Sequence, residues 1–232
     1  MDHQSKPPVS PSLTSGLPAP AHLYLASQSP RRRELLGQIG VTPILLLPDE
    51  DEDAEALEQT RSNESARDYV ERVTRAKAHA AAHRWQRRCL PRAPILCADT
   101  TVTIDGQILG KPKDAADAAR ILRLLSGRRH QVLTAVTLWM PRSTSHDDAF
   151  SDASASPIAF ALSTSEVQFS LLDDNSIQRY IDSGEPFGKA GAYGIQGRGA
   201  AFIAHLNGSY SGVMGLPLFE TAQLLRQAGL NT

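Results

Sequence analysis

The distribution of apolar and polar positions along the chain predicts a domain that contains both strands and helices. Short apolar or alternating runs, which are typical of strands, occur at 23–26, 41–47, 94–104, 131–140, 158–169 and 201–206. Apolar residues at helical spacing predict helices over 63–87, 115–126, 173–183 and 217–228. These elements do not follow a strict strand–helix–strand repeat, so we expect an α/β or α+β domain with a mixed sheet.

A further helix is expected to begin near Pro30, directly after the first apolar run. Ser29 suits the N-cap position, and proline is favoured in the first turn of a helix. The turn nevertheless carries Arg31, Arg32 and Arg33, although the positive end of a helix dipole favours anions. This arrangement indicates that an external anion, most naturally a phosphate, binds at the turn. The alternative is a set of solvated arginines on an exposed turn.

The dipeptide at 105–106, Asp-Gly, predicts a two-residue hairpin after the strand at 94–104. Counting back along both strands from this turn places Thr100 opposite Lys111. Asp99 is then close to both, although the neighbouring glycine and proline could alter the register. The hairpin therefore brings a carboxylate and a cation into one region.

Several other charged residues occupy positions that indicate a role in binding or catalysis rather than simple solvation at the surface. Lys77 lies on the apolar stripe of the longest predicted helix, so it either extends along the surface or reaches into a pocket. Lys111 and Lys189 have glycine or proline beside them, which lets backbone approach a ligand. Asp99 stands in mid-strand with no turn signal, and Glu52 belongs to an acidic cluster. Cations with isolated carboxylates suit metal-assisted phosphoryl chemistry.

Composition excludes several other functions. The formal net charge of −1 provides no basic field for a nucleic-acid polymer, so the anion site must be local. No apolar run approaches the roughly eighteen residues of a membrane span, and no membrane partner is expected. The 2 cysteines lack metal-site spacing and a disulfide pattern, which fits the reducing cytoplasm. No Walker or dinucleotide fingerprint occurs, and His130 is interpreted as a turn residue.

Two polar segments lie outside the predicted elements. Residues 1–20 are rich in serine and proline and are expected to form a disordered tail rather than a signal peptide. Residues 141–157 separate two predicted strands and are interpreted as a flexible, tolerated loop insertion. A single catalytic domain is therefore expected over 21–232.

The chain resembles the Maf family over about residues 22–227. The resemblance is specific, because many short motifs occur in the family's order. They are Leu25-Ala26-Ser27 with Ser29-Pro30-Arg31-Arg32, Arg72 with Lys77-Ala78, Ala98-Asp99-Thr100, Gly110-Lys111-Pro112, Leu125-Ser126-Gly127, the run 130–134, Gly184-Glu185-Pro186 with Lys189-Ala190-Gly191, the run 193–197, and Gly215-Leu216-Pro217-Leu218.

The resemblance implies a fold like that of the inosine triphosphate pyrophosphatases: an elongated, twisted mixed sheet flanked by helices, with a central substrate cleft. It also implies the reaction of nucleoside triphosphate pyrophosphatases, which cut between the α and β phosphates. Products are a nucleoside monophosphate and pyrophosphate, and the cofactor is a divalent cation, Mg²⁺ or Mn²⁺. A homodimer is the implied oligomer.

Residue by residue, Asp99 matches the family's catalytic position, where it would deprotonate water or hold the metal that does so. The groups that would line the triphosphate are Ser27, Arg31, Arg32, Lys77, Lys111 and Lys189. Positions associated with choice of base are matched by Arg31, Thr100 and Gln196. Arg33 has no match in the motif. The family's acidic site residue corresponds to Glu50 or Glu52, and ungapped counting favours Glu52 as a metal ligand beside Asp99.

The segment around Gln196 looks like the subfamily that acts on dTTP and UTP. An amide both donates and accepts hydrogen bonds, which suits a pyrimidine edge. The expected function is thus to remove normal or modified pyrimidine triphosphates from the nucleotide pool. The alternatives are a 7-methyl-GTP pyrophosphatase and a non-catalytic nucleotide-binding regulator of septum formation. Two departures from the family pattern are Gly188, where an acidic residue is common, and the long segment 141–157.

Overall fold

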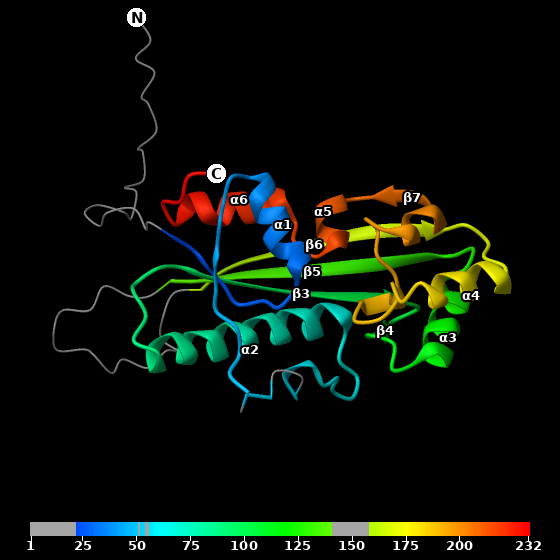
Figure 1. Cartoon of the computed structure of the whole chain (residues 1–232), viewed down its shortest axis with the longest axis horizontal. Helices are drawn as coiled ribbons and strands as arrows, with labels where there is room; N and C mark the ends of the chain where they lie inside the picture. Colours follow the sequence, from blue (N-terminus) through cyan, green and yellow to red (C-terminus); the bar gives the residue numbers. More distant parts are fainter. Residues whose placement is uncertain (1–21, 51, 54–55, 141–157) are drawn as a thin grey trace, which may run out of the picture.

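A twisted, mixed sheet runs along the length of the molecule in the computed structural model (Figure 1), which describes residues 22–50, 52–53, 56–140 and 158–232. The 7-stranded sheet has the order β2-β1-β3-β5-β6-β7, with β4 added to β3. Its strands are β1 (Tyr24–Leu25), β2 (Ile44–Leu45), β3 (Ile95–Ile104), β4 (Gln107–Leu109), β5 (Arg129–Trp139), β6 (Ile158–Phe169) and β7 (Ile203–Asn207). The contacts of β1 with β2 and β3 are parallel and the others antiparallel, which confirms the expected mixed sheet.

Helices cover both faces of this sheet. Their bounds are α1 (Pro30–Gln38), α2 (Ala66–Arg87), α3 (Ala115–Leu125), α4 (Asp174–Asp182), α5 (Tyr210–Met214) and α6 (Leu218–Gln227). Short 3-10 turns are η1 (Ala56–Glu58), η3 (Ala190–Ala192) and η4 (Arg198–Phe202). Figure 1 shows α2 along one face, α1, α5 and α6 on the other, and α3 with α4 at one end. None of the described helices is long and apolar enough to cross a membrane.

Side chains of β3 point alternately toward the helical layer of α2 and toward the layer of α1 and α6, because successive side chains of a strand face opposite sides of the sheet. Ile95 and Cys97 pack with small residues of α2, whereas Leu96 and Ala98 pack in the cluster beneath α1 and α6. Burial of these apolar residues fixes the register of β3, because a shift by one residue would turn every side chain to the wrong face.

The edge of β3 that faces away from β5 is interrupted. β1 pairs only with Ile95 and Leu96, and β4 pairs only with the stretch 102–104. Between them, residues 97–101 have no strand beside them on that edge among the residues described here. Asp99 and Thr100 lie in this gap on opposite faces, and both line the same cavity.

Most sequence expectations are confirmed, but several details are wrong. β2 is shorter than the expected 41–47, since Pro43 and Pro48 flank it and cannot donate to a ladder. α2 begins at 66 rather than 63, where the Ser65 side chain accepts from the amide of Asp68. Ser29 occupies the N-cap position of α1, but its side chain makes no capping hydrogen bond.

Two further expectations fail for tertiary reasons. The β3–β4 ladder ends at Val102 opposite Leu109, so Thr100 does not pair with Lys111. His130 is not a turn residue: it is buried on β5, with Nε2 2.9 Å from the hydroxyl of Tyr193. The short helix α5 was not expected. The predicted tail at 1–20 and the predicted loop at 141–157 lie outside the described residues.

Burial of His130 makes stability depend on pH. Burial lowers its pKa from 6.5 to about 4, so the fold favours the neutral ring. Between these values the unfolded chain binds the extra proton, so this contribution is complete above pH 6.5 and lost as the pH falls toward 4. We expect a loss on the order of 3 kcal/mol across this window. Urea unfolding at several pH values should show a shallower decline for His130→Gln than for the exposed-site control His205→Gln; equal declines would contradict the assignment.

Candidate active site

A cavity of about 720 Å³ lies at the interrupted edge of β3. This volume is within the usual range of sites for small ligands. Its walls come from the start of α1, the middle of β3, α2, the segment 188–196 and the end of α5. All the residues expected from the resemblance at the site line this cavity: Ser27, Arg31, Arg32, Glu52, Lys77, Asp99, Thr100, Lys111, Lys189 and Gln196.

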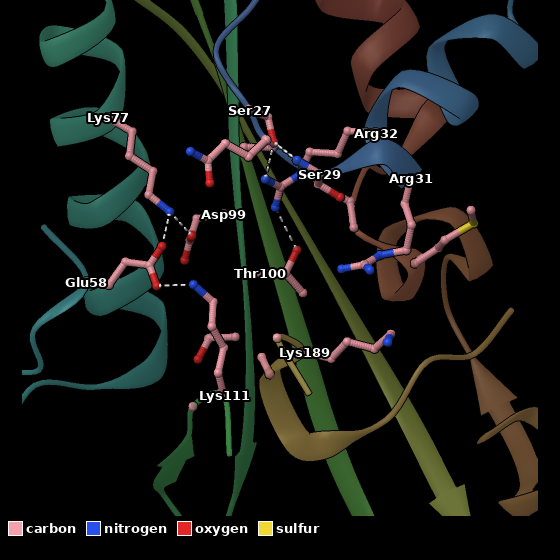
Figure 2. Close-up of a pocket in the computed structure, with 18 of the residues that line it drawn as sticks. Ser27, Ser29, Arg31, Arg32, Glu58, Lys77, Asp99, Thr100, Lys111 and Lys189 are labelled. Carbon is pink, nitrogen blue, oxygen red and sulfur yellow. Dashed lines mark hydrogen bonds and ion pairs between the residues drawn. The ribbon is translucent and has the colours of Figure 1, made fainter. Parts of the chain in front are cut away.

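On the α2 side of the cavity, lysines and carboxylates alternate in a connected cluster (Figure 2). Lys77 Nζ lies 2.6 Å from Asp99 Oδ1 and 2.7 Å from Glu58 Oε1, and Lys111 Nζ lies 2.8 Å from Glu58 Oε2. Burial alone would lower the pKa of Lys77, but the charges of Asp99 and Glu58 outweigh it and raise that pKa. Lys77 is therefore charged and reaches into the pocket rather than along the surface.

Glu58 was not predicted from the sequence, yet its carboxylate bridges the two lysines. Burial opposes its ionisation, but Lys77 and Lys111 together lower its pKa. Side chains of α2 hold the backbone around it. The hydroxyl of Tyr69 donates to the Glu58 carbonyl at 2.9 Å, and Arg72 donates to the carbonyls on either side of it at 3.3 and 2.9 Å. No local signal in the sequence distinguishes Glu58 from the other acidic residues of 49–58.

Glu52 occupies another part of the cavity wall. Its carboxylate is bound by Arg84 near the end of α2, with Arg84 Nε 3.0 Å from Oε1, and also by Arg87 at 2.8 Å. These arginine contacts lower the pKa of Glu52 despite some burial. Glu52 thus anchors the segment after β2 to α2. Glu50, the other residue considered, is exposed and does not line the cavity.

Arg32 organises the opposite wall. Its Nε donates to the carbonyl of Gly215 at 2.8 Å, Nη1 to Ser27 Oγ at 3.0 Å, and Nη2 to Thr100 Oγ1 at 3.5 Å. Burial lowers the pKa of the guanidinium, with Asp99 opposing that effect. Each nitrogen of Arg32 therefore already contacts the protein, so this residue joins α1, β3 and the end of α5 into one wall.

Arg31 and Lys189 carry positive charge that no carboxylate neutralises by an ion pair within the described part of the chain. Figure 2 shows both on the side of Thr100 away from the lysine–carboxylate cluster. Burial lowers the pKa of each, and the charge of Arg31 lowers the pKa of Lys189 further, while the charge of the Glu185 carboxylate opposes this shift without forming an ion pair. Among the described residues, Lys189 Nζ donates to the neutral carbonyl of Glu185. An anionic ligand would relieve this uncompensated charge.

The segment that carries Lys189 and Gln196 is held by hydrogen bonds to Glu185 and by packing against β3 rather than by strand pairing. Both carboxylate oxygens of Glu185 are used, Oε1 by the hydroxyl of Tyr180 at 2.9 Å and Oε2 by the amide of Arg198 at 2.9 Å. Gly191 has a φ of +71°, and a Cβ there would lie 2.8 Å from a methyl of Val102. Only glycine fits this approach to β3, which places Lys189 at the cavity.

The described residues contain no group of three or more His, Cys, Asp and Glu side chains that could hold a metal ion by themselves. Mg²⁺, however, is commonly bound by one or two carboxylates together with substrate phosphates. Asp99 and Glu58 share Lys77 and both line the cavity. The two carboxylates therefore fit a cation that phosphate oxygens of a ligand also bind.

The fold and the cavity define an α/β protein with a cavity lined by several cations at the open edge of a mixed sheet. Comparison with known sequences gives its family: the Maf-like protein family matches residues 22–228, and the chain belongs to it.

Two curated relatives are similar over almost the whole chain. A dTTP/UTP pyrophosphatase of Ralstonia nicotianae is 62% identical over 209 residues, which are 90% of this chain and 95% of that protein. A dTTP/UTP pyrophosphatase of Cupriavidus metallidurans is 59% identical over 209 residues, 90% of this chain and 98% of that protein. Among solved structures, the Staphylococcus aureus Ham1 protein matches with a TM-score of 0.39 and 14% identity, covering 64% of this chain and 71% of that one. That likeness is too low to bear on function.

Proposed function

We propose that this protein is a nucleoside triphosphate pyrophosphatase that hydrolyses dTTP and UTP to the nucleoside monophosphate and pyrophosphate. The observation that carries the proposal is the pair of cations Arg31 and Lys189, which form no ion pair among the described residues, in a cavity that Asp99 also lines. The names of the curated relatives support the same reaction and substrates. Removal of normal or modified pyrimidine triphosphates from the cytoplasmic pool is the proposed role.

Binding of the triphosphate is assigned to the cations and to Ser27. Arg31 and Lys189 neutralise phosphate oxygens, and Lys111 can turn from Glu58 toward the same ligand because its side chain is half exposed. Arg32 acts mainly by orienting Ser27 and the wall around it. Gln196 and Thr100 face the base, since both line the cavity and can form hydrogen bonds with it.

Asp99 is proposed as the catalytic residue. In this mechanism its carboxylate accepts a proton from a water molecule, whose oxygen attacks the α-phosphorus. The bond from the α-phosphorus to the bridging oxygen breaks, and that oxygen keeps the electron pair and leaves with pyrophosphate. Lys77, 2.6 Å from Asp99 Oδ1, holds the carboxylate in place. The surrounding cations stabilise the charge that develops on pyrophosphate.

A divalent cation, Mg²⁺ or Mn²⁺, is the proposed cofactor. Asp99 would hold the cation together with a second carboxylate. Glu58 is favoured for this role because it shares Lys77 with Asp99, whereas Glu52 is the residue that ungapped counting from Arg31 favours. The cation would neutralise phosphate charge and lower the pKa of a bound water. We further propose that residues 21–232 form a single catalytic domain and that the protein acts as a homodimer. Its partner is the free nucleotide rather than a nucleic-acid polymer or a membrane.

Substitution of the proposed catalytic carboxylate tests the mechanism. Asp99→Asn keeps the shape of the side chain but removes its charge, so kcat for pyrophosphate release from dTTP and UTP should fall at least about a hundredfold. Asp105→Asn, on the exposed β3–β4 turn, is the matched control and should retain activity. Release by Asp99→Asn at the rate of the parent protein would refute the assignment.

A second pair of variants decides which glutamate serves the site. Glu58→Gln leaves Lys77 and Lys111 without their shared carboxylate, so kcat/KM should fall about tenfold or more. Glu52→Gln should instead lower the midpoint of urea unfolding, because Arg84 is buried against it, and change kcat/KM far less. The reverse pattern would show that Glu52 is the acidic site residue.

A further inference from the structure

Glu185 connects the two ends of the loop between α4 and η4 through its carboxylate. The hydroxyl of Tyr180 donates to Oε1 at 2.9 Å, the amide of Gly199 to Oε1 at 3.1 Å, and the amide of Arg198 to Oε2 at 2.9 Å. The loop also packs tightly around this carboxylate, because a Cβ at Gly197 would lie 2.5 Å from Oε1. The carboxylate therefore fixes where the loop leaves α4 and where it enters η4.

The side chain of Lys189 is held at two points, and both depend on this carboxylate. Its Nζ donates to the backbone carbonyl of Glu185. Its stem packs on Gly194, where a Cβ would lie 3.1 Å from Lys189 Cε. The amide of Gly194 donates to the hydroxyl of Tyr180 at 3.1 Å, and that hydroxyl donates to the Glu185 carboxylate. The position of the ammonium group is thus set by the loop that Glu185 closes.

The ammonium group of Lys189 retains the capacity to bind an anion. It has three hydrogens, and the contact with Glu185 uses one of them. Lys189 lines the cavity together with Arg31. We propose that Glu185 is a positioning residue for phosphate binding, because its carboxylate fixes the loop that presents Lys189 to the cavity. This inference rests on the proposed function, in which Lys189 binds the triphosphate, and deepens it.

The substitution Glu185→Gln keeps the size and shape of the side chain but changes its hydrogen-bonding capacity. An amide has one accepting oxygen, and its NH₂ group only donates. In one orientation the NH₂ group faces the amide of Arg198, and in the other it faces the amide of Gly199. Either orientation leaves a main-chain donor without its acceptor, so the loop must shift. The backbone carbonyl that Lys189 contacts is unchanged, so any effect on Lys189 comes from the position of the loop.

The test measures the dissociation constant of inorganic pyrophosphate by titration calorimetry at constant Mg²⁺. We expect Glu185→Gln to weaken binding about fivefold or more and to raise KM for UTP by a similar factor. In a Lys189→Met background the same substitution should cause no further loss, because its effect passes through the ammonium group. Asp182→Asn, at the exposed end of α4, is the matched control and should bind pyrophosphate like the parent protein.

Tyr180→Phe provides the same test if Glu185→Gln does not fold. It removes the hydroxyl between Glu185 and Gly194 and keeps the ring that packs on Phe202, and its effect should also vanish in the Lys189→Met background.

An unchanged affinity of Glu185→Gln for pyrophosphate would overturn the inference. An equal loss with and without Lys189 would also overturn it, since that result indicates a merely structural role. A parent protein that binds pyrophosphate but releases none from UTP would overturn the proposed function alone, because the affinities would still decide the role of Glu185.

Discussion

The interruption in the edge of β3 is the constraint on which the rest of the site depends. β1 leaves the edge after Leu96, and β4 joins it only at Val102. Strand geometry sends Asp99 and Thr100 to opposite faces, and in a continuous sheet two such neighbours could not share a ligand. At the gap, both line one cavity. The same strand therefore supplies a proposed catalytic group and a proposed base contact.

Charge is distributed unequally around this gap. On the α2 side, Lys77 and Lys111 are neutralised by Asp99 and Glu58, and the cluster is complete without a ligand. On the α1 side, Arg31 and Lys189 form no ion pair with a carboxylate of the described residues, and burial together with the charge of Arg31 lowers the pKa of Lys189 despite the opposing charge of Glu185. In the proposed mechanism the half with Arg31 and Lys189 binds the phosphates, while Lys77 on the other half holds the Asp99 carboxylate in place.

Local signals account for what the sequence predicted well. Pro30 and the arginines after it, the Asp-Gly turn and the alternation along β3 each act within a few residues, so α1, the β3–β4 hairpin and the central strands were foreseen. Features set by distant contacts were not. Glu58 reaches the site because α2 binds the carbonyls around it, and His130 is buried because Tyr193 packs on its ring. Several acidic residues in 49–58 gave no local reason to choose among them.

The central claim is that Arg31 and Lys189 hold the triphosphate with its α-phosphorus at Asp99. A crystal structure with Mg²⁺ and the α,β-imido analogue of dUTP, which cannot be cleaved at the bond in question, tests it directly. We expect the β- and γ-phosphates to contact Arg31 and Lys189, and the α-phosphate to lie beside Asp99. A nucleotide bound in another place, or with its α-phosphate remote from Asp99, would contradict the account.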